Sequence, residues 1–415
     1  MSSTTRGPLA SFFLRLGRQV WVRAALFTVI GIVVALAAGI LGPLLPFQFG
    51  LELGQNAVGS LLQIIATAML TVSTFSVTAM VTAFSSATTT ATPRSTPLLI
   101  ADPTSQNAVS TFVGAFTFSL VGIVALSTGY YQPQGRTILF VSTLVIIGIV
   151  VFTLLRWISH LSTFGRMADV IDRVERAATT SCEMHAAQPT LGARAAIVVA
   201  AGAEAVHADE VGYVTHVDVA GLDRLARQHR LTVHVRATPG RIADARTPLA
   251  LVTGVVDDDV RAGIRRAFRI EHHRTYEQDP RFGVIALAEI GSRALSAATN
   301  DPGTAIEVIA ALQRVFSRAL AATPDRAVTY EHVFVPAPRL ADLVDDAFRP
   351  LARDGSGDVE VQVRLQKCLA SLAASAPDRS GVFRDAARAA LTRSRRDLDR
   401  SDRRMLTAAV EEVWR

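Results

Sequence analysis

The chain has 415 residues, of which 50% are hydrophobic and only 19% are charged, fewer than the roughly 25% charged residues of a typical soluble protein. The first 158 residues contain seven Arg and two acidic residues, out of 42 basic and 36 acidic residues in the whole chain. A nucleic-acid-binding protein would carry its excess positive charge on a soluble face, so this distribution argues against that class. Two cysteines, Cys182 and Cys368, exclude a disulfide framework and a cysteine zinc site.

Four long uncharged stretches in the N-terminal part predict an integral membrane protein. A helix needs about 20 apolar residues to cross the hydrocarbon core of a bilayer. The first stretch is longer than the apolar core of a cleaved signal peptide, so we interpret it as a span. We expect a helical membrane domain over residues 1–158, with four spans at about 24–45, 60–84, 108–130 and 137–157.

Arginine placement predicts the orientation of these spans. Arg6, Arg15, Arg18 and Arg23 precede the first span, Arg94 lies between the second and third, and Arg156 and Arg166 follow the core of the fourth. Positive residues concentrate on the cytoplasmic side of membrane proteins. We therefore expect both termini in the cytoplasm, although Arg136, between spans three and four, is an exception to the pattern.

Hydroxyl residues recur along the second expected span at a mean spacing of about 3.6, which places them on one helical face. Such a face permits close packing against another helix, or it lines a path in which hydroxyls replace part of a solute's hydration. Arg94, after this span, is either a topology anchor or a residue at the inner mouth of such a path. The candidate pore-lining residues are Thr67, Thr71, Thr74, Thr78, Thr82, Ser85 and Thr89.

The segment after the spans is expected to be a soluble α+β region. We expect the fourth span to continue as a helix into a connector over 159–194. A small β-rich module is expected over 195–256, in which apolar and polar residues alternate from Leu231 to Ala237, with further strands near 213–219 and 249–252. The order of strands and turns is similar to a barrel-sandwich hybrid. No cofactor is expected, because the only lysine of the chain is Lys367, outside this module.

Residues 257–415 are expected to be mainly helical, with the last helical runs at 339–352, 358–374 and 382–414. Asp257, and the Asp-Pro pairs at Asp279 and Asp301, have the pattern of helix N-caps, and so does Asp102-Pro103 at the start of the third span. Titratable residues are dense between and around these caps, and the sequence leaves open whether they are structural or functional. No catalytic residue or metal site is predicted. The polar cluster consists of His272, His273, Glu277, Asp279, Arg281, Asn300 and Asp301.

Several of these features together resemble one family of bacterial membrane proteins, catalogued as domain of unknown function 2254. The resemblance rests on the four spans, on Pro93-Arg94 after the hydroxyl-rich span, and on the segments Tyr276–Gly283 and Asn300-Asp301-Pro302. This sequence departs from the family pattern at Ala297-Ala298-Thr299, where a Pro-Gly turn is usual. The resemblance implies a bacterial inner-membrane setting with multiple spans, and it implies no activity.

Three function classes remain open on the sequence. The first is a homo-oligomeric channel or passive transport protein, with the second span lining the path. The second is a membrane-anchored regulatory or scaffold protein whose cytoplasmic part binds a protein partner or small ligand. The third is a membrane-bound enzyme acting at the polar cluster, which is the least favoured. The expected partners are the lipid bilayer and further copies of the chain, without nucleic acid.

Overall fold

The computed structural model describes residues 20–41, 55–199, 201–325 and 327–415. These form two compact units. The membrane unit contains the described residues up to Thr89 together with Pro93–Asp169, and the C-terminal unit contains Thr90–Thr92 and Val170–Arg415.

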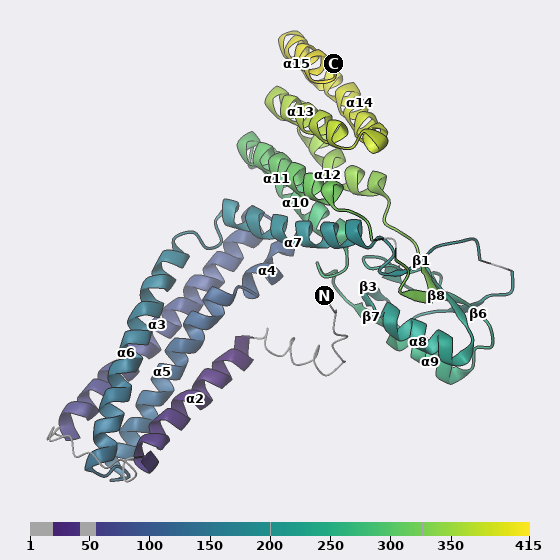
Figure 1. Ribbon diagram of the computed structural model, residues 1–415. Helices are drawn as coiled ribbons and strands as arrows, with labels where there is room; N and C mark the ends of the chain where they lie inside the picture. Colours follow the sequence, from purple (N-terminus) through teal and green to yellow (C-terminus); the bar gives the residue numbers. More distant parts are fainter. Residues whose placement is uncertain (1–19, 42–54, 200, 326) are drawn as a thin grey trace. The chain divides into compact units, whose positions relative to one another are not determined.

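Four helices of the membrane unit are long and apolar enough to cross a membrane, which confirms the expected number of spans. They are α2 (Val20–Leu41), α3 (Gln55–Thr90), α5 (Pro103–Ser127) and α6 (Pro133–Leu161) (Figure 1). A 3-10 turn (Pro93–Ser95) and the short α4 (Thr96–Ile100) join α3 to α5. The second helix extends beyond the expected 60–84 at both ends, whereas the third begins before residue 108 and ends at Ser127, short of the expected 130. Residues 42–45, at the expected end of the first span, lie outside the described residues.

Small residues and tyrosine hydroxyls hold this bundle together. A Cβ added to Gly31 of α2 would lie 2.7 Å from the carbonyl oxygen of Gly114 in α5, so only glycine permits this approach. The hydroxyl of Tyr131, after α5, donates to the carbonyl of Ala35 in α2 at 2.8 Å. Of the four span helices, α5 is the most enclosed: 56% of its most apolar stretch is buried, against 17–28% in the other three.

A turn separates α6 from α7 (Met167–Ala187). The sequence predicts that the fourth span continues into the connector as one helix, and this prediction is wrong. Gly165 adopts a φ of +74° in the turn, a left-handed conformation that favours glycine, and it approaches Ala83 of α3 too closely for a side chain.

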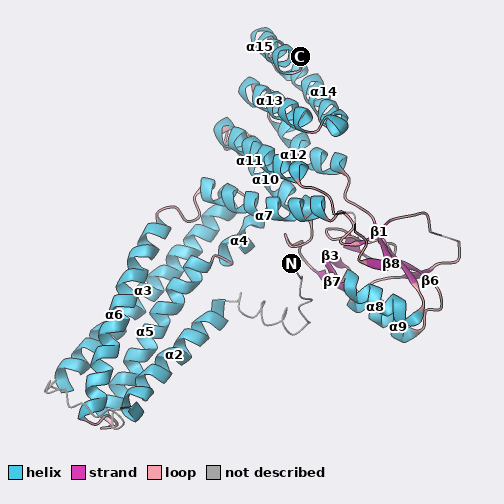
Figure 2. Ribbon diagram, viewed as in Figure 1, coloured by secondary structure: helices cyan, strands magenta, loops and turns pink. Residues whose placement is uncertain are grey.

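Two sheets form the β part of the C-terminal unit (Figure 2). The five-stranded sheet has the order β1-β8-β4-β6-β2, with β8 parallel to β1 and β4 and the remaining pairs antiparallel. The three-stranded sheet has the order β5-β3-β7. The strands are β1 (Ala193–Ala195), β2 (Glu204–Val206), β3 (Gly212–Val217), β4 (Thr232–Val235), β5 (Ile242–Ala243), β6 (Ala250–Thr253), β7 (Phe268–Glu271) and β8 (Tyr330–Val335).

The core of this region lies between the sheets and two helices, α8 (Val219–His229) and α9 (Asp258–Arg266). Val233 of β4, Leu222 of α8 and Ile264 of α9 are fully buried in it. The strands expected near 213–219, 231–237 and 249–252 are present. β7 and β8 follow residue 256 in the sequence and complete the two sheets, and this topology does not confirm a barrel-sandwich hybrid.

Helices complete the C-terminal unit, as the sequence predicts for residues after 257. Gly283 of α10 packs so closely on Ala178 of α7 that an added Cβ would lie 2.6 Å from the Ala178 Cα. The helical run expected at 382–414 is divided in two, because Asp399 caps a new helix. These helices are α10 (Pro280–Ala294), α11 (Pro302–Ala321), α12 (Leu340–Asp354), α13 (Val359–Ser375), α14 (Ser380–Asp397) and α15 (Arg400–Val413).

Candidate functional site

The seven candidate pore-lining hydroxyls form a continuous row along α3, which we call the hydroxyl stripe: Thr67, Thr71, Thr74, Thr78, Thr82, Ser85 and Thr89. All seven side chains are exposed. The buried residues of α3 include Ile65, Met69, Ser76 and Met80, each two positions from a stripe residue, or about 200° around a helix at 3.6 residues per turn. The stripe therefore points away from the other described helices of the membrane unit.

The threonine hydroxyls of the stripe are bonded to their own helix. Thr74 donates to the carbonyl of Leu70 at 2.9 Å, and Thr78 donates to that of Thr74 at 3.0 Å. Thr67, Thr71, Thr82 and Thr89 make the same bond to the residue four positions earlier. Because each hydroxyl hydrogen is engaged and an oxygen has further lone pairs, the stripe presents hydrogen-bond acceptors on its outer side.

The outer sides of α2 and α6 have a different chemistry. Their exposed large side chains include Leu26, Val29 and Val33 on α2 and Val145, Phe152 and Leu155 on α6, all of them apolar. Apolar residues flank the stripe on α3 as well, among them Ile64 and Phe75. Within the described membrane unit, only α3 presents a continuous row of hydroxyls along its exposed side.

At one end of the membrane unit, a buried carboxylate joins α5 to α6. Asp102 caps α5, as the sequence predicts, by accepting from the Ser105 backbone N–H at 2.7 Å and from its hydroxyl at 2.6 Å. The His160 Nε2 lies 3.0 Å from the same carboxylate, a contact that the sequence does not reveal because 58 positions separate the two residues. Arg94 is exposed in the turn after α3. Whether it is a topology anchor or a residue at the inner mouth of a path stays a prediction.

The polar cluster expected around residues 271–301 is divided among separate places in the C-terminal unit. Glu277 pairs with Arg269 of β7 at 2.7 Å. Arg281 makes two bonds to Asp346 of α12, at 2.6 and 3.0 Å, and the pKa of its guanidinium is raised by that carboxylate. His272 and His273 are exposed.

Asp279 is the most buried member of the cluster, with 1% of its surface exposed. It caps α10 by accepting from the backbone N–H groups of Arg281 and Phe282. Arg274 donates to its carboxylate from Nε and lies 2.7 Å away through a second nitrogen. Both oxygens of this buried carboxylate are thus used, Oδ1 for the cap and Oδ2 for the arginine.

Asn300 and Asp301 lie in the turn between α10 and α11. Asn300 adopts a φ of +48°, which asparagine tolerates better than most residues. Asp301 caps α11 through the backbone N–H of Thr304, and the hydrogen bonds from Thr304 lower the pKa of its carboxyl. The structure thus brings Asp279 and Arg281 together at one helix start and does not gather the cluster into one site. Among the described residues, no group of three or more His, Cys, Asp and Glu could hold a metal ion.

A buried polar group that the sequence does not indicate lies on α8. The Asp223 carboxylate accepts from the His332 backbone N–H at 3.0 Å and from Arg227 at 2.7 Å, and His332 Nδ1 lies 3.2 Å away. Burial alone would raise the pKa of Asp223, but these hydrogen bonds outweigh it and lower the pKa. The group ties α8 to β8.

A small cavity of about 150 Å³ lies between α7, α11 and α12. Cys182 and His185 form one wall, and Val315, Phe316 and Leu343 are among its apolar lining. Burial raises the pKa of Cys182 to about 12 and lowers the pKa of His185. A thiol with such a pKa stays protonated at neutral pH and is not a nucleophile.

The comparisons with known proteins agree with this architecture. The model of the family described as "Predicted membrane protein (DUF2254)" matches residues 17–371, and the chain belongs to this family. Uncharacterized proteins of Mycobacterium bovis and Mycobacterium tuberculosis are each 26% identical over 409 residues, which cover 92% of this chain and 78% of the relative. No solved structure matches the chain.

Proposed function

We propose that this member of the family is a homo-oligomeric channel or passive transport protein of the inner membrane, with both termini in the cytoplasm. In this proposal the hydroxyl stripe of α3 faces a path enclosed by several copies. One observation carries it: the stripe is exposed on the side of α3 opposite its buried residues, whereas the exposed sides of α2 and α6 are apolar.

The chemistry of the stripe favours a hydrated path over contact with lipid. The apolar faces of α2 and α6 suit hydrocarbon, and a row of hydroxyl oxygens can replace part of a solute's hydration shell. Since the threonine hydrogens are engaged by the helix itself, the outward oxygens suit cations or neutral solutes with hydrogen-bond donors. No residue of the stripe carries a charge, which suits passive flow rather than coupled transport.

The competing interpretation is that the stripe packs against α3 of another copy. Small hydroxyl residues allow helices to approach closely. Both interpretations predict an oligomer, but they differ in what a bulky apolar residue does. In a path it obstructs flow, whereas in a contact it separates the helices.

The test replaces Thr74→Leu and Thr78→Leu together and measures release of K⁺ and of glycerol from liposomes, beside size-exclusion chromatography. We expect the variant to keep its oligomer and to lose most of the flux of the unaltered protein. Val145→Leu is the matched control, because Val145 is exposed on the apolar side of α6, and it should leave flux unchanged. A variant that dissociates would decide for packing, and an unaltered protein that passes neither probe would contradict the channel.

Orientation is tested by labelling a cysteine introduced by Ser401→Cys, at an exposed position of α15. Cys182 and Cys368 are buried, and burial raises the pKa of each to about 12, so neither competes for a thiol reagent. A membrane-impermeant maleimide should label the variant only after the cells are opened. Labelling in intact cells would overturn the cytoplasmic placement.

A second candidate is a membrane-anchored regulatory or scaffold protein whose C-terminal unit binds a partner or ligand. Strongly exposed apolar side chains in the β region favour it, among them Val198 at 96% and Val255 at 86% exposure, since such residues can mark interaction surfaces. Absence of flux combined with an oligomer that is unaffected by Thr78→Leu would favour this candidate.

A further inference from the structure

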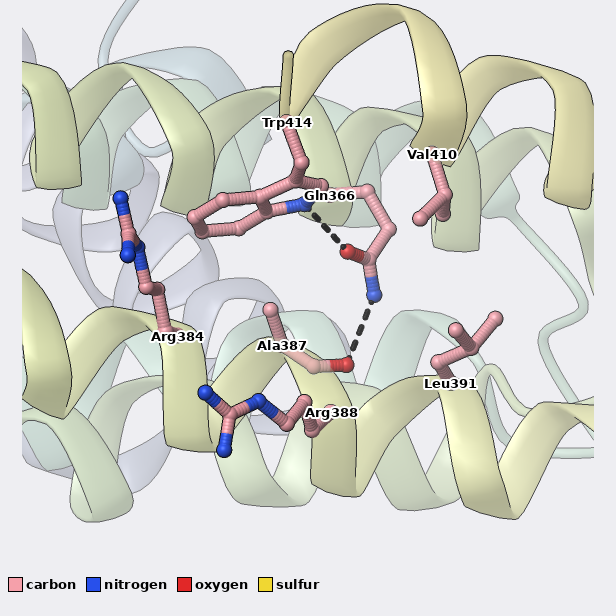
Figure 3. Close-up of a pocket in the computed structure, with 7 residues that line it drawn as sticks. All are labelled: Gln366, Arg384, Ala387, Arg388, Leu391, Val410 and Trp414. Carbon is pink, nitrogen blue, oxygen red and sulfur yellow. Dashed lines mark hydrogen bonds between the residues drawn. The ribbon is translucent and has the colours of Figure 1, made fainter.

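An open cleft of about 320 Å³ lies among α13, α14 and α15 in the C-terminal unit (Figure 3). Its volume is at the lower end of the range of about 300–1,000 Å³ that is typical of small-molecule sites. The side chains that define it are Gln366, Arg384, Arg388, Leu391, Val410 and Trp414.

A buried amide fixes the aromatic wall of the cleft. The oxygen of Gln366 accepts from the Trp414 indole N–H at 3.0 Å, and its nitrogen donates to the carbonyl of Ala387 at 2.9 Å. Gln366 is only 1% exposed. The indole ring is therefore held in one orientation by a residue that is itself anchored to α14.

The cleft has a cationic end and an apolar end. Figure 3 shows Arg384 and Arg388 on one side of the Gln366 amide and Leu391 and Val410 on the other. Arg384 has no carboxylate within ion-pair distance among the described residues, and Arg388 has only an exposed contact with Asp385 at 3.4 Å. The positive charges of these two guanidinium groups, one helical turn apart, are little neutralised by carboxylates. They are therefore suited to bind the acid group of a ligand.

We propose that this cleft binds a small organic carboxylate with a flat apolar body, of the arylacetate class. The acid group would lie against Arg384 and Arg388, and the body would lie along the indole of Trp414 towards Leu391 and Val410. A lone inorganic anion would leave the apolar end empty, and a neutral apolar molecule would leave the arginines without a partner. This site is independent of the path proposed along α3.

The test uses the full-length protein in an uncharged detergent, with isothermal titration of 1-naphthaleneacetate and of 1-naphthaleneacetamide. The two probes have nearly the same shape, and only the first carries a charge. We expect saturable binding of one acid per chain, with the amide weaker by at least about tenfold, since hydrogen bonds to charged groups are the stronger kind.

Variants assign the binding to the cleft. Arg384→Gln with Arg388→Gln should weaken binding of the acid by at least about tenfold and leave the amide unchanged. The matched control, Arg395→Gln with Arg396→Gln, removes two exposed arginines from the same helix outside the cleft and should leave both affinities unchanged. Equal affinity for acid and amide, equal loss in the control pair, or no binding of the acid at millimolar concentration would overturn the proposal. Thermal unfolding of each variant checks that the helices remain folded.

Discussion

The threonines of the hydroxyl stripe and the ion pairs of the C-terminal unit use their polar groups in different ways. In the membrane unit, the threonines of the hydroxyl stripe bond to carbonyls four residues earlier in the same helix. In the C-terminal unit, ion pairs join distant parts of the chain. Glu175 and Arg314 are 139 positions apart, and Arg281 and Asp346 are 65 positions apart.

This contrast indicates where substitutions should act. A hydroxyl that bonds to its own helix stabilises no contact between helices of its own chain, so its outward side remains available for a path or for another copy. An ion pair between distant elements fixes their packing, and its loss leaves a charge without its partner. We therefore expect stability effects in the C-terminal unit and effects on flux or assembly along the stripe.

The largest stability effect is expected at Asp279. Asp279→Ala should lower the free energy of unfolding by about 3–5 kcal/mol, because it leaves the half-buried Arg274 without its carboxylate partner and uncaps α10. Asp301→Ala, which removes only an exposed cap, should cost about 0.5–2 kcal/mol. Urea unfolding of the full chain, followed by circular dichroism, measures both. Equal costs would show that the Arg274 contact contributes nothing.

A steric contact provides the next test. Gly283→Ala would place a Cβ 2.6 Å from the Ala178 Cα, between α10 and α7, and overpacking of this kind costs about 1–3 kcal/mol. Gly381→Ala is the control, since nothing lies within 4 Å of its added Cβ. Alanine is the better helix former by up to about 1 kcal/mol, so the control should unfold at the same or a higher urea concentration. Similar destabilisation by both changes would contradict the packing.

Local patterns in the sequence predict much of the fold, because they depend on neighbouring residues. The caps at Asp102, Asp257, Asp279 and Asp301 are confirmed, since a cap needs only a carboxylate and the N–H groups two or three positions later. The spans and the stripe follow equally from composition and helical periodicity. β8 shows no regular alternation of apolar and polar residues from Tyr330 to Val335, and its parallel pairing with β1 and β4 cannot be inferred from one sequence.

Contacts between distant residues explain what the sequence does not reveal. Asp223 is the single acid of α8 and Asp346 is one of several acids of α12. Nothing near them in the chain indicates His332 or Arg281 as partners. The titratable residues between 271 and 301 suggest one cluster because they are close in sequence. The sheet and the helices direct them to different partners, so closeness in sequence does not become a shared site.

A smaller effect is expected from the pH dependence of His234, which stacks on Phe334 and is 6% exposed. Burial and, secondarily, Arg236 lower the pKa of His234 below its ordinary 6.5. The unfolded chain therefore takes up a proton near pH 6.5 that the folded chain excludes, so stability falls as the pH drops below that value.

His234→Phe should remove this contribution and raise stability at neutral pH by about 1 kcal/mol, because the Nδ1 atom has no hydrogen-bond partner among the described residues. Urea unfolding at pH 7.5 and pH 5.5 measures the difference. His229→Gln, at an exposed position of α8, is the control and should keep the pH dependence. If the stability of His234→Phe depended on pH as that of the unaltered protein does, His234 would take up its proton as readily in the folded chain as in the unfolded chain.

The smallest effect is expected within the stripe itself. Thr78→Ala removes a hydroxyl that is exposed and bonded only to its own helix among the described residues, so it should change the unfolding free energy by less than about 0.6 kcal/mol, the average for interhelical hydrogen bonds in membranes. Ser76→Ala, two positions earlier on the buried side, removes the acceptor of the Trp157 indole N–H at 2.9 Å. A buried donor left unpaired costs about 1–3 kcal/mol, so this variant should be clearly less stable.

The same pair of variants separates stability from transport. If α3 lines a path, Thr78→Ala should alter the ratio of K⁺ to glycerol release, because one acceptor oxygen is lost while the width is not reduced. Ser76→Ala should leave that ratio unchanged, since its side chain lies on the opposite side of the helix, among the other helices of the chain. A ratio that changes only in Ser76→Ala would place any path on the buried side of α3, and the exposed stripe would then be a surface for lipid or for another copy.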